Sequence, residues 1–552
     1  MDPTRILPDQ FRSLARAADE LLRGSLRLAC VAVGSAPPPW RTPATAWALA
    51  QRGPLMGSVF RLRAATHPNR VAVVDSQGSL SYAQLNARVN QLAHVLHAEG
   101  ISGGRLALLL PNCRELLEGF GAAAKLGVSP IPVNTRFHAE EVERLLAKQH
   151  VKAVIVDPAF VDRVFDFPGT VLVRGEDYES ALAPMPDSEP PRGDEDAPLV
   201  IHTSGTTGHP KGAERRLETS DPSSVVGFCA RVPIAPGDCI VVPAPLYHAL
   251  GFFGTGVALA VGGTQVLMER FDPQDFVSLA SAHAAAGAAL VPVMLKRILD
   301  LDPAVLARHD LGCLRYVVVS GSALPPALVD RARQVFGPTL LNLYGSTEAG
   351  WVSIATDADM AAHPGTVGRP LPGVGVRITR EDGGIAGAGE DGEIVVESGT
   401  MFSGYTEDAT LGSVAAPAHL YEMGDLGRMD ADGYLYVADR KDDMVVTGGE
   451  NVYPAEVERV LEQAPGVVDV AVVGVPDEEY GHILVAFAVT DAVVPHVPTA
   501  EGLKAFCREH LANYKVPKAV WFIDALPYTG SGKVLRRVLR QEATRRTTAS
   551  PT

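Results

Sequence analysis

Cysteine is scarce in this sequence: there are six in 552 residues, and no two form a Cys-x-x-Cys pair. Such usage excludes a disulfide scaffold, disfavours a structural zinc site and is typical of a reducing compartment. The sequence also lacks any run of 18 or more apolar residues, so we expect no membrane-spanning helix. With 49 basic against 64 acidic residues, the formal net charge is −15, and we expect no nucleic-acid partner.

The remaining composition is that of an ordinary globular protein. Apolar residues make up 46% and charged residues 20% of the chain, which argues against extensive disorder. The 53 glycines and 42 prolines follow no period, so a collagen-like chain is excluded. A length of 552 residues exceeds what one hydrophobic core supports, and we therefore expect several domains.

Residues 1–54 predict an N-terminal extension with an amphipathic helix at 11–30. Arg12, Arg16, Arg23 and Arg27 fall on one side of this helix, and mostly leucines lie opposite. We expect the helix to cap the main domain, and peripheral membrane association through its basic side is the alternative. A signal peptide is a third interpretation, but acidic residues stand where a positive region belongs.

From about residue 70, short β-rich runs alternate with helical patterns, which predicts an α/β fold with a largely parallel sheet. The predicted helices are 82–99, 113–125 and 139–148. The predicted strands are 71–74, 105–110, 128–132, 151–156, 199–202, 239–243, 264–267, 289–292, 316–320 and 340–343. A polar, proline-rich loop interrupts the pattern at 187–198.

After about residue 368 the pattern changes to short strands separated by turns, which is typical of a small antiparallel unit. A second break near 439–443 precedes a compact α+β segment of normal domain size. We predict a large domain with several subdomains over 55–440, a small mobile C-terminal domain over 441–545 and a disordered tail over 546–552.

The most specific motif extends from Thr203 to Gly212 and reads Thr-Ser-Gly-Thr-Thr-Gly-His-Pro-Lys-Gly. Its glycines let backbone N–H groups approach an anion, and its hydroxyls and lysine add donors for phosphate oxygens. It is not a Walker A loop, because Pro210 replaces the second glycine and Gly212 replaces the Ser or Thr that holds Mg²⁺. The segment therefore predicts a phosphate-binding loop of another kind.

Further motifs follow in order: Tyr-Gly-Ser-Thr-Glu at 344–348, Tyr-Glu-Met-Gly-Asp at 421–425, Asp-Arg-Lys-Asp-Asp at 439–443, Gly-Gly-Glu-Asn-Val-Tyr-Pro at 448–454 and Gly-Ser-Gly-Lys at 530–533. With this set the sequence resembles the adenylate-forming superfamily over roughly residues 55–545, and within it the fatty acyl-CoA synthetases. The resemblance implies a ligase that works in two steps. A carboxylate attacks the α-phosphate of ATP to give acyl-AMP and pyrophosphate, and a thiol then displaces AMP.

The resemblance also assigns roles to residues. The β- and γ-phosphates of ATP would be bound by Thr203, Ser204, Gly205, Thr206, Thr207, Gly208 and Lys211. The adenine slot would be formed by Gly321, Ser322, Ala323, Asn342, Leu343, Tyr344, Gly345 and Ser346, with Tyr344 stacked on the base. Thr347 would contact the α-phosphate and Glu348 would hold Mg²⁺. Asp425, helped by Arg440, would accept the ribose hydroxyls.

The small domain would supply the remaining parts by the same resemblance. Lys533 would bridge the acyl carboxylate and the α-phosphate, and Asp442 would be the hinge. Gly448 and Gly449 would line the pantetheine tunnel. The chain departs from the family in three places. Met423 replaces a Thr or Ser, which puts one local hydrogen bond in doubt, and Asp439 replaces a glycine, which would stiffen the hinge. Residues 214–216, Glu-Arg-Arg, are more charged than the usual continuation of the phosphate loop.

The acid substrate is predicted from the segment that follows His248, a residue that by resemblance gates the acyl pocket. Residues 251–263 are uniformly small or apolar, with no carboxylate to pair with the α-amine of an amino acid. We therefore expect a medium- or long-chain fatty acid, with ATP, Mg²⁺ and coenzyme A as cofactors and the cytoplasm as the location.

Three alternatives stay open at this point. One is an acyl-AMP ligase that loads a carrier protein, and another is a ligase that joins an aryl or other carboxylate to CoA. The third is a nucleotide-binding relative without enzymatic activity. The presence of Lys211, Glu348, Asp425 and Lys533 argues against the third.

Overall fold

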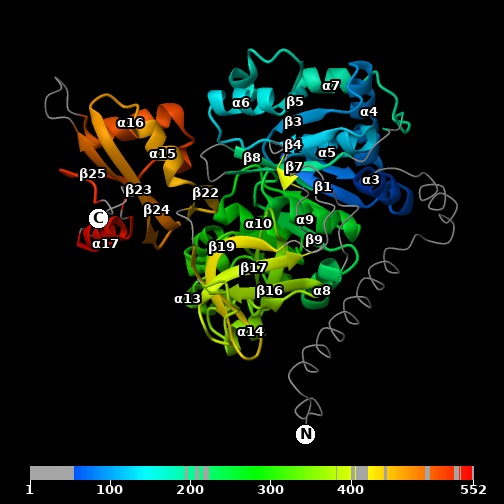
Figure 1. Ribbon diagram of the computed structural model, residues 1–552. Coiled ribbons are helices and arrows are strands. Elements are labelled where there is room, and N and C mark those ends of the chain that lie inside the picture. The colour runs from blue at the N-terminus through cyan, green and yellow to red at the C-terminus, as the bar shows by residue number, and fades with distance from the viewer. Residues whose placement is uncertain are drawn as a thin grey trace, which may run out of the picture.

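The computed structural model describes residues 55–549 except 192, 194–196, 205–209, 216–222, 381, 399–403, 406–419, 441–443, 491–497, 528–533 and 535. A large part of the molecule ends with β20 (Leu435–Arg440), and a small part that begins with β21 (Val445–Thr447) lies against one side of it (Figure 1). The predicted α/β class with a small α+β unit at the C-terminal end is confirmed.

The largest sheet in the described chain has nine strands in the order β15-β14-β13-β12-β11-β9-β10-β1-β2. Its members are β1 (Val71–Asp75), β2 (Gly78–Ser81), β9 (Cys239–Val242), β10 (Thr264–Leu267), β11 (Gly287–Leu290), β12 (Tyr316–Val319), β13 (Leu340–Ser346), β14 (Gly350–Thr356) and β15 (Arg369–Pro370). The strands from β13 to β1 are parallel, and every residue of β11 and β12 is buried. Such apolar strands need helices on both faces of the sheet.

Helices cover both faces. One face carries α3 (Leu55–Thr66), α4 (Tyr82–Ala98), α5 (Arg114–Leu126), α8 (Ser223–Arg231) and α9 (Ala249–Ala260). The other carries α10 (Pro273–Ala282), α11 (Pro292–Leu299), α12 (Pro303–Leu306), α13 (Pro326–Phe336) and α14 (Asp357–Ala362). Local sequence fixes several starts: Ser81 and Gln84 form a capping box at α4, and Asp272 caps α10 ahead of Pro273.

A second parallel sheet has the order β4-β3-β5-β6. It consists of β3 (Arg105–Leu109), β4 (Ser129–Pro132), β5 (Val151–Val156) and β6 (Thr170–Val173), with α6 (Ala139–Lys148), the 3₁₀ helix η3 (Pro158–Val164) and α7 (Glu176–Leu182) around it. Two antiparallel sheets follow. One holds β7 (Leu199–Ser204), β8 (Pro210–Arg215) and β18 (Gly404–Tyr405), and the other holds β16 (Val374–Thr379), β17 (Gly392–Ser398), β19 (Tyr421–Met429) and β20.

The small part is built on a five-stranded sheet. Its strands are β21, β22 (Glu450–Val452), β23 (Val467–Asp477), β24 (Gly481–Thr490) and β25 (Ala519–Phe522). One face packs on α15 (Pro454–Leu461) and α16 (Ala500–His510), and the other on α17 (Arg536–Ala549). In Figure 1, β22 lies next to the large part and α17 lies on the far side.

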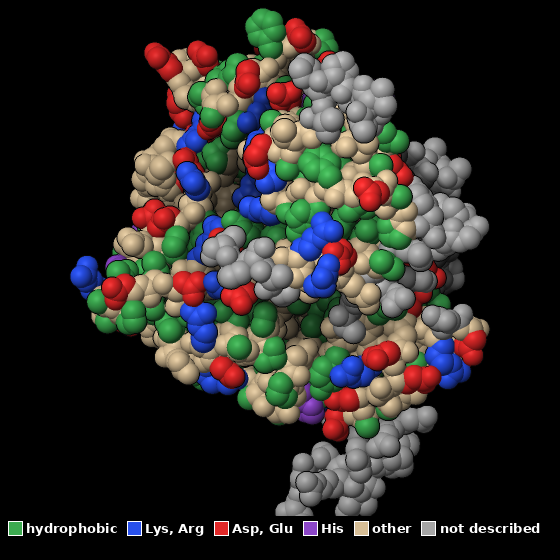
Figure 2. Space-filling model, turned by 90° about the vertical axis from the view of Figure 1, so that its left-hand side faces the viewer, with side chains coloured by type: hydrophobic (Ala, Val, Ile, Leu, Met, Phe, Trp, Pro, Cys, Tyr) green, Lys and Arg blue, Asp and Glu red, His purple; other side chains and the backbone are tan. Residues whose placement is uncertain are grey.

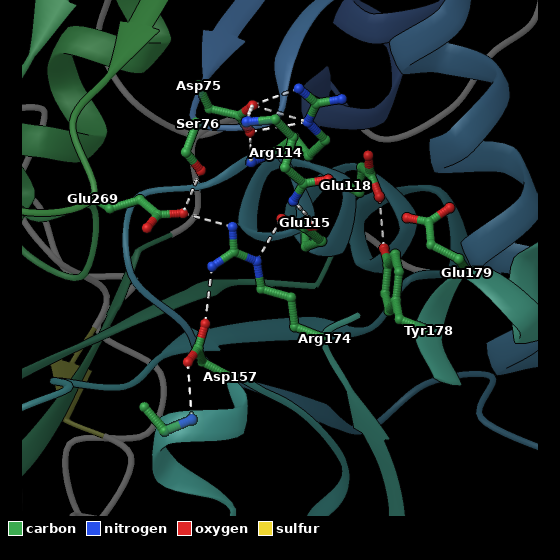
Figure 3. A network of polar contacts seen from close by, with 12 residues as sticks. Asp75, Ser76, Arg114, Glu115, Glu118, Asp157, Arg174, Tyr178, Glu179 and Glu269 are labelled. Carbon is green, nitrogen blue, oxygen red and sulfur yellow. Dashed lines mark hydrogen bonds and ion pairs between the residues drawn. The ribbon is translucent and has the colours of Figure 1, made fainter. Parts of the chain in front are cut away.

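A network of charged side chains, most of them buried or half-buried, joins the two parallel sheets (Figure 3). Arg174 follows β6 and contacts Asp157 at 2.9 Å, Glu115 at 3.3 Å and Glu269, which follows β10, at 2.6 Å. Nearby, the Tyr178 hydroxyl donates to Glu118 at 2.7 Å. Because each carboxylate drawn there has a partner, we interpret the network as structural.

Three expectations need correction. The strand predicted at 289–292 is β11, Gly287–Leu290, because Pro292 has no N–H and begins α11 instead. The single parallel sheet is in fact two, since periodicity identifies a strand but not its neighbours. Residues 546–549 continue α17 rather than a disordered tail, because Arg546 lies over the Trp521 ring at 5.4 Å and pairs with Glu542 at 2.7 Å. The predicted helix at 11–30 lies outside the described residues.

Within the described ranges, no helix combines the length and the apolar character needed to cross a membrane.

Candidate active site

The predicted site residues of the large part gather where parallel strands end. Val319 of β12 is paired with Asn342 of β13, so the turn that begins at Gly321 stands beside Tyr344. His248 is the N-cap of α9 and follows the end of β9, another strand of the same sheet. The edge where parallel strands end is the usual ligand-binding edge of such sheets. The structure therefore brings together the residues predicted for the adenine slot and the acyl gate.

A tight hairpin presents Thr347 and Glu348 at this edge. Strands β13 and β14 are antiparallel, and a Cβ atom on Gly345 would lie 2.1 Å from the carbonyl oxygen of Gly350. Only glycine fits this crossing of two backbones. The Ser346 hydroxyl accepts a hydrogen bond from the Ala349 N–H at 3.0 Å, which fixes the turn that carries both predicted phosphate and Mg²⁺ ligands.

Tyr344 is joined to Asp425, which comes from a different sheet. The Tyr344 hydroxyl donates to Oδ2 of Asp425 at 2.6 Å, and Asp425 is buried. Met423, two residues earlier on β19, also points inward and packs in an apolar cluster, so a hydroxyl at that position is not needed to hold the strand. Asp425 is the registered partner of Arg440 on β20. The predicted ribose ligand is thus held next to the predicted base-stacking ring.

Asn342 lies below the adenine slot, and its role is structural as well. Its amide donates to the carbonyl of Thr366 at 3.3 Å, and the Thr366 hydroxyl donates to the carbonyl of Leu435 at 2.9 Å. Through Thr366, these bonds tie the middle of β13 to β20.

The two-glycine turn of the small part reaches the same edge. Gly448 and Gly449 have φ angles of +58° and +83° between β21 and β22. A Cβ atom on Gly449 would lie 3.2 Å from Cγ1 of Val291, and one on Gly321 would lie 3.4 Å from that same atom. The predicted CoA tunnel and the predicted adenine slot are therefore separated by a single side chain, that of Val291.

His248 contacts the small part through Glu450. Nε2 of His248 lies 3.0 Å from one carboxylate oxygen of Glu450, and the Arg136 guanidinium lies 3.3 Å from the other. Burial raises the pKa of Glu450, but His248, Arg136 and Lys515 lower it by more, so its pKa lies below the ordinary range. Glu450 is thus a buried carboxylate anion between two groups of the large part.

A second contact lies beside the glycine turn. Gly448 donates its N–H to the carbonyl of Tyr480 at 2.9 Å. The Lys518 ammonium lies 4.7 Å from the centre of the Tyr480 ring, and the Arg297 guanidinium lies 5.8 Å from it. Arg297 also pairs with Glu479 at 2.6 Å. Two cations therefore flank one aromatic ring next to the turn.

Several predicted residues cannot be placed against this geometry. Thr203, Ser204 and Lys211 are on the β7–β8 hairpin, where Thr203 pairs with Lys211, but their side chains are not among those described. The same holds for the Arg440 side chain. Gly205, Thr206, Thr207, Gly208, Asp442 and Lys533 lie outside the described residues. Val534, next to Lys533, packs in the cluster under α17.

Sequence reasoning missed Glu450, Arg136, Tyr480 and Arg297. Glu450 belongs to the Gly-Gly-Glu motif quoted above, so the sequence did mark its position. Its contact with His248 gives the structural reason for a carboxylate there. The other three lie outside the motifs, and only the docking of the small part reveals them.

Comparison with known proteins identifies the family. Residues 60–406 match the model of the AMP-binding enzyme family, and residues 456–533 match that of the AMP-binding enzyme C-terminal domain. The chain belongs to this family of adenylate-forming ligases, which use ATP, Mg²⁺ and CoA.

Relatives in this family act on different acids. The chain is 34% identical to a long-chain-fatty-acid–CoA ligase of Mycobacterium tuberculosis, FadD13, over 88% of this chain and 98% of the relative. It is also 34% identical to a feruloyl-CoA synthase of Amycolatopsis sp, with the same coverage of both chains. The structure of o-succinylbenzoate CoA synthetase from Bacillus subtilis, bound to a product analogue, superimposes with a TM-score of 0.78 at 27% identity, covering 89% and 98% of the chains.

Proposed function

We propose that this ligase activates an apolar monocarboxylic acid, a medium- or long-chain fatty acid, to acyl-AMP and transfers the acyl group to CoA. One observation carries the proposal: Val291 is close to both Gly321 of the nucleotide side and Gly449 of the thiol side. An acyl-adenylate bound at this edge would be within reach of a thiol arm that passes the glycine turn.

In the first step, an oxygen of the acid attacks the α-phosphorus of ATP, and the bond to pyrophosphate breaks. Tyr344 and the loop at Gly321 would hold the adenine, and Asp425 the ribose. Thr347 and Glu348 lie on the hairpin at the same edge, where Glu348 would hold the Mg²⁺ that offsets phosphate charge. Lys211 and Lys533 are proposed to offset the remaining anionic charge, and the Thr203 hydroxyl is proposed to donate a hydrogen bond to a phosphate oxygen.

In the second step, the thiol loses its proton to solvent and its sulfur attacks the acyl carbon, and AMP leaves with the electron pair of the broken C–O bond. The thiol arm would follow the turn at Gly448 and Gly449, which add no side chains of their own beside Tyr480 and Val291. Tyr480, flanked by Lys518 and Arg297, would receive the phosphate-bearing end of CoA. Figure 2, which faces the side of the small part, shows a hollow with both basic and acidic side chains around it.

The proposed acyl side is α9, which begins immediately after His248. Its sequence, Ala-Leu-Gly-Phe-Phe-Gly-Thr-Gly-Val-Ala-Leu-Ala, contains no charge. A Cβ atom on Gly254 would meet nothing closer than 3.6 Å, and one on Gly256 would have open space around it. An apolar acyl tail is therefore favoured over an amino acid, whose ammonium would lack a counter-charge here.

A substrate panel tests the proposal. The full-length protein is incubated with ATP, Mg²⁺ and octanoate, palmitate, ferulate, o-succinylbenzoate or leucine, with and without CoA. We expect the fastest pyrophosphate exchange with one of the two fatty acids and acyl-CoA only when CoA is present. Faster exchange with ferulate or succinylbenzoate would replace the fatty acid by a ring-bearing acid. Thioester on a carrier protein but not on CoA would refute the proposed acceptor.

A further inference from the structure

One buried lysine joins the two parts of the molecule. Lys515, at the end of the 3₁₀ helix η5 (Asn513–Lys515), is only 1% exposed. Its ammonium donates to Oε1 of Glu456 at 2.7 Å and to Oε1 of Glu141 at 2.8 Å. Glu456 belongs to α15 of the same small part, whereas Glu141 belongs to α6 of the large part.

Side chains near Glu141 complete the contact. The Lys515 ammonium lies 5.4 Å from the centre of the Phe137 ring. The Asn134 amide donates to the Tyr514 hydroxyl at 3.4 Å. Residues 134–141 thus contribute Asn134, Phe137 and Glu141 to this contact with the small part. Arg136, in the same segment, donates a hydrogen bond to Glu450.

The charges explain why this contact depends on orientation. Burial lowers the pKa of Lys515, but Glu456 and Glu141 raise it by more, so Lys515 is a cation held between two carboxylates. Glu456 stays with Lys515 wherever the small part moves, so the lysine always keeps one partner. Glu141 can pair with Lys515 only in the orientation seen here, and both regain water when the parts separate. The pair therefore favours one orientation while adding little to the stability of either part.

We propose that Glu141 is a positioning residue for the thiol-transfer step. Acting through Lys515, it holds the small part so that Gly449 stays at Val291 and Glu450 at His248. Glu141 belongs to none of the segments assigned to ATP or to the acid, so we expect adenylation to proceed without it. The kinetic test of this inference rests on the proposed function, whereas the cross-linking test of the docked orientation does not.

The test compares Glu141→Gln with Glu140→Gln, a change of an exposed carboxylate on the same helix. Glutamine keeps one oxygen for the His138 N–H, which now donates to Oε2 of Glu141 at 2.9 Å, so α6 retains its N-terminal bond. We expect single-turnover thioester formation from supplied acyl-adenylate to slow about fivefold in Glu141→Gln. Pyrophosphate exchange stays within about twofold of the unaltered protein, and Glu141→Asp recovers part of the loss.

A second readout needs no activity. Arg297→Cys and Glu479→Cys place a cross-linking pair at another point of the interface, and a bismaleimide reports the docked orientation in full-length protein. We expect the cross-linking rate to fall by the same factor in the Glu141→Gln background, with an unchanged melting temperature. If CoA fails as acceptor but cross-linking falls, the proposed function is wrong and the positioning role stands. Unchanged cross-linking, or equal loss of both half-reactions, would overturn the positioning role.

Discussion

The hydroxyl of Tyr344 lies 2.6 Å from Oδ2 of Asp425 and donates a hydrogen bond to it. Tyr344 comes from the end of β13 in the nine-stranded sheet, and Asp425 comes from β19 in a separate antiparallel sheet. The two are 81 residues apart, yet one bond joins the ring proposed to stack on adenine to the carboxylate proposed to bind ribose. The nucleotide site is therefore shaped by two sheets rather than by one loop.

Removing this bond should weaken nucleotide binding. In Tyr344→Phe the ring can still stack, but the buried carboxylate of Asp425 loses a donor that orients it. We expect the KM for ATP to rise about tenfold, with a smaller change in kcat, because hydrogen bonds to charged groups contribute about 1.5–3 kcal/mol. Tyr434→Phe is a matched control, since that hydroxyl donates to Asp359 at 2.7 Å. Equal effects of both variants on KM would contradict a role of Tyr344 in the nucleotide site.

A methyl group at Gly449 should block the thiol step. Alanine there is strained at a φ of +83° and its Cβ would press on Val291 at 3.2 Å. We expect Gly449→Ala to slow thioester formation at least about tenfold while pyrophosphate exchange continues. Gly383→Ala controls for backbone strain, because Gly383 has a φ of +81° and nothing within 4 Å. A similar loss of thioester formation in both variants would show that strain, not the passage, is responsible.

Lys533 should matter only for adenylation. If its ammonium acts as one donor to the reacting oxygens, Lys533→Ala should lower the adenylation rate by about 10²–10³-fold. Thioester formation from supplied acyl-adenylate should be spared, because the glycine turn would occupy the site in that step. The two half-reactions are timed separately by pyrophosphate exchange and single-turnover thioester assays. Equal loss in both steps, in a folded protein, would contradict an alternation of Lys533 and Gly449 at one site.

Acid should release the small part from the large one. The pKa of Glu450 lies below its ordinary value of 4.5, despite burial, because His248, Arg136 and Lys515 stabilise the anion. A carboxyl whose pKa is lower in the docked state stabilises that state above about pH 4.5, and the stabilisation is lost as pH falls further. We expect the radius of gyration to stay constant from pH 8 to 5 and to increase below about 4. Glu450→Gln should show a smaller acid-induced change, and a transition of the unaltered protein near pH 6 would contradict the assignment.

The N-terminal extension should be dispensable for catalysis. All motifs follow residue 200, so a protein without residues 1–50 should adenylate nearly as fast as the full chain. If the basic side of the predicted helix binds membranes, the truncation should also abolish sedimentation with vesicles of anionic lipid. A truncated protein that folds but no longer adenylates would reveal a catalytic part in the extension.

Local patterns in the sequence were enough to predict the class of fold, the positions of most elements and the family. Capping residues, prolines and apolar runs are local signals, and they place helices such as α4 and strands such as β12 within a residue or two. The motifs are local too, so the segment from Tyr344 to Glu348 and the Gly448–Gly449 pair could be identified in the sequence, whereas the hairpin and the turn that they form come from the structure.

Which of these segments contact one another depends on the packing of the whole chain. Periodicity identifies a strand but carries no information about its neighbours in a sheet, so the division into two parallel sheets and the Tyr344–Asp425 bond could not be predicted. The contact of Glu141 with Lys515 spans 374 residues and two separate hydrophobic cores. In its own segment, each of the two residues is indistinguishable from an ordinary charged surface side chain. Its role arises from burial, and that burial depends on how the small part docks on the large part.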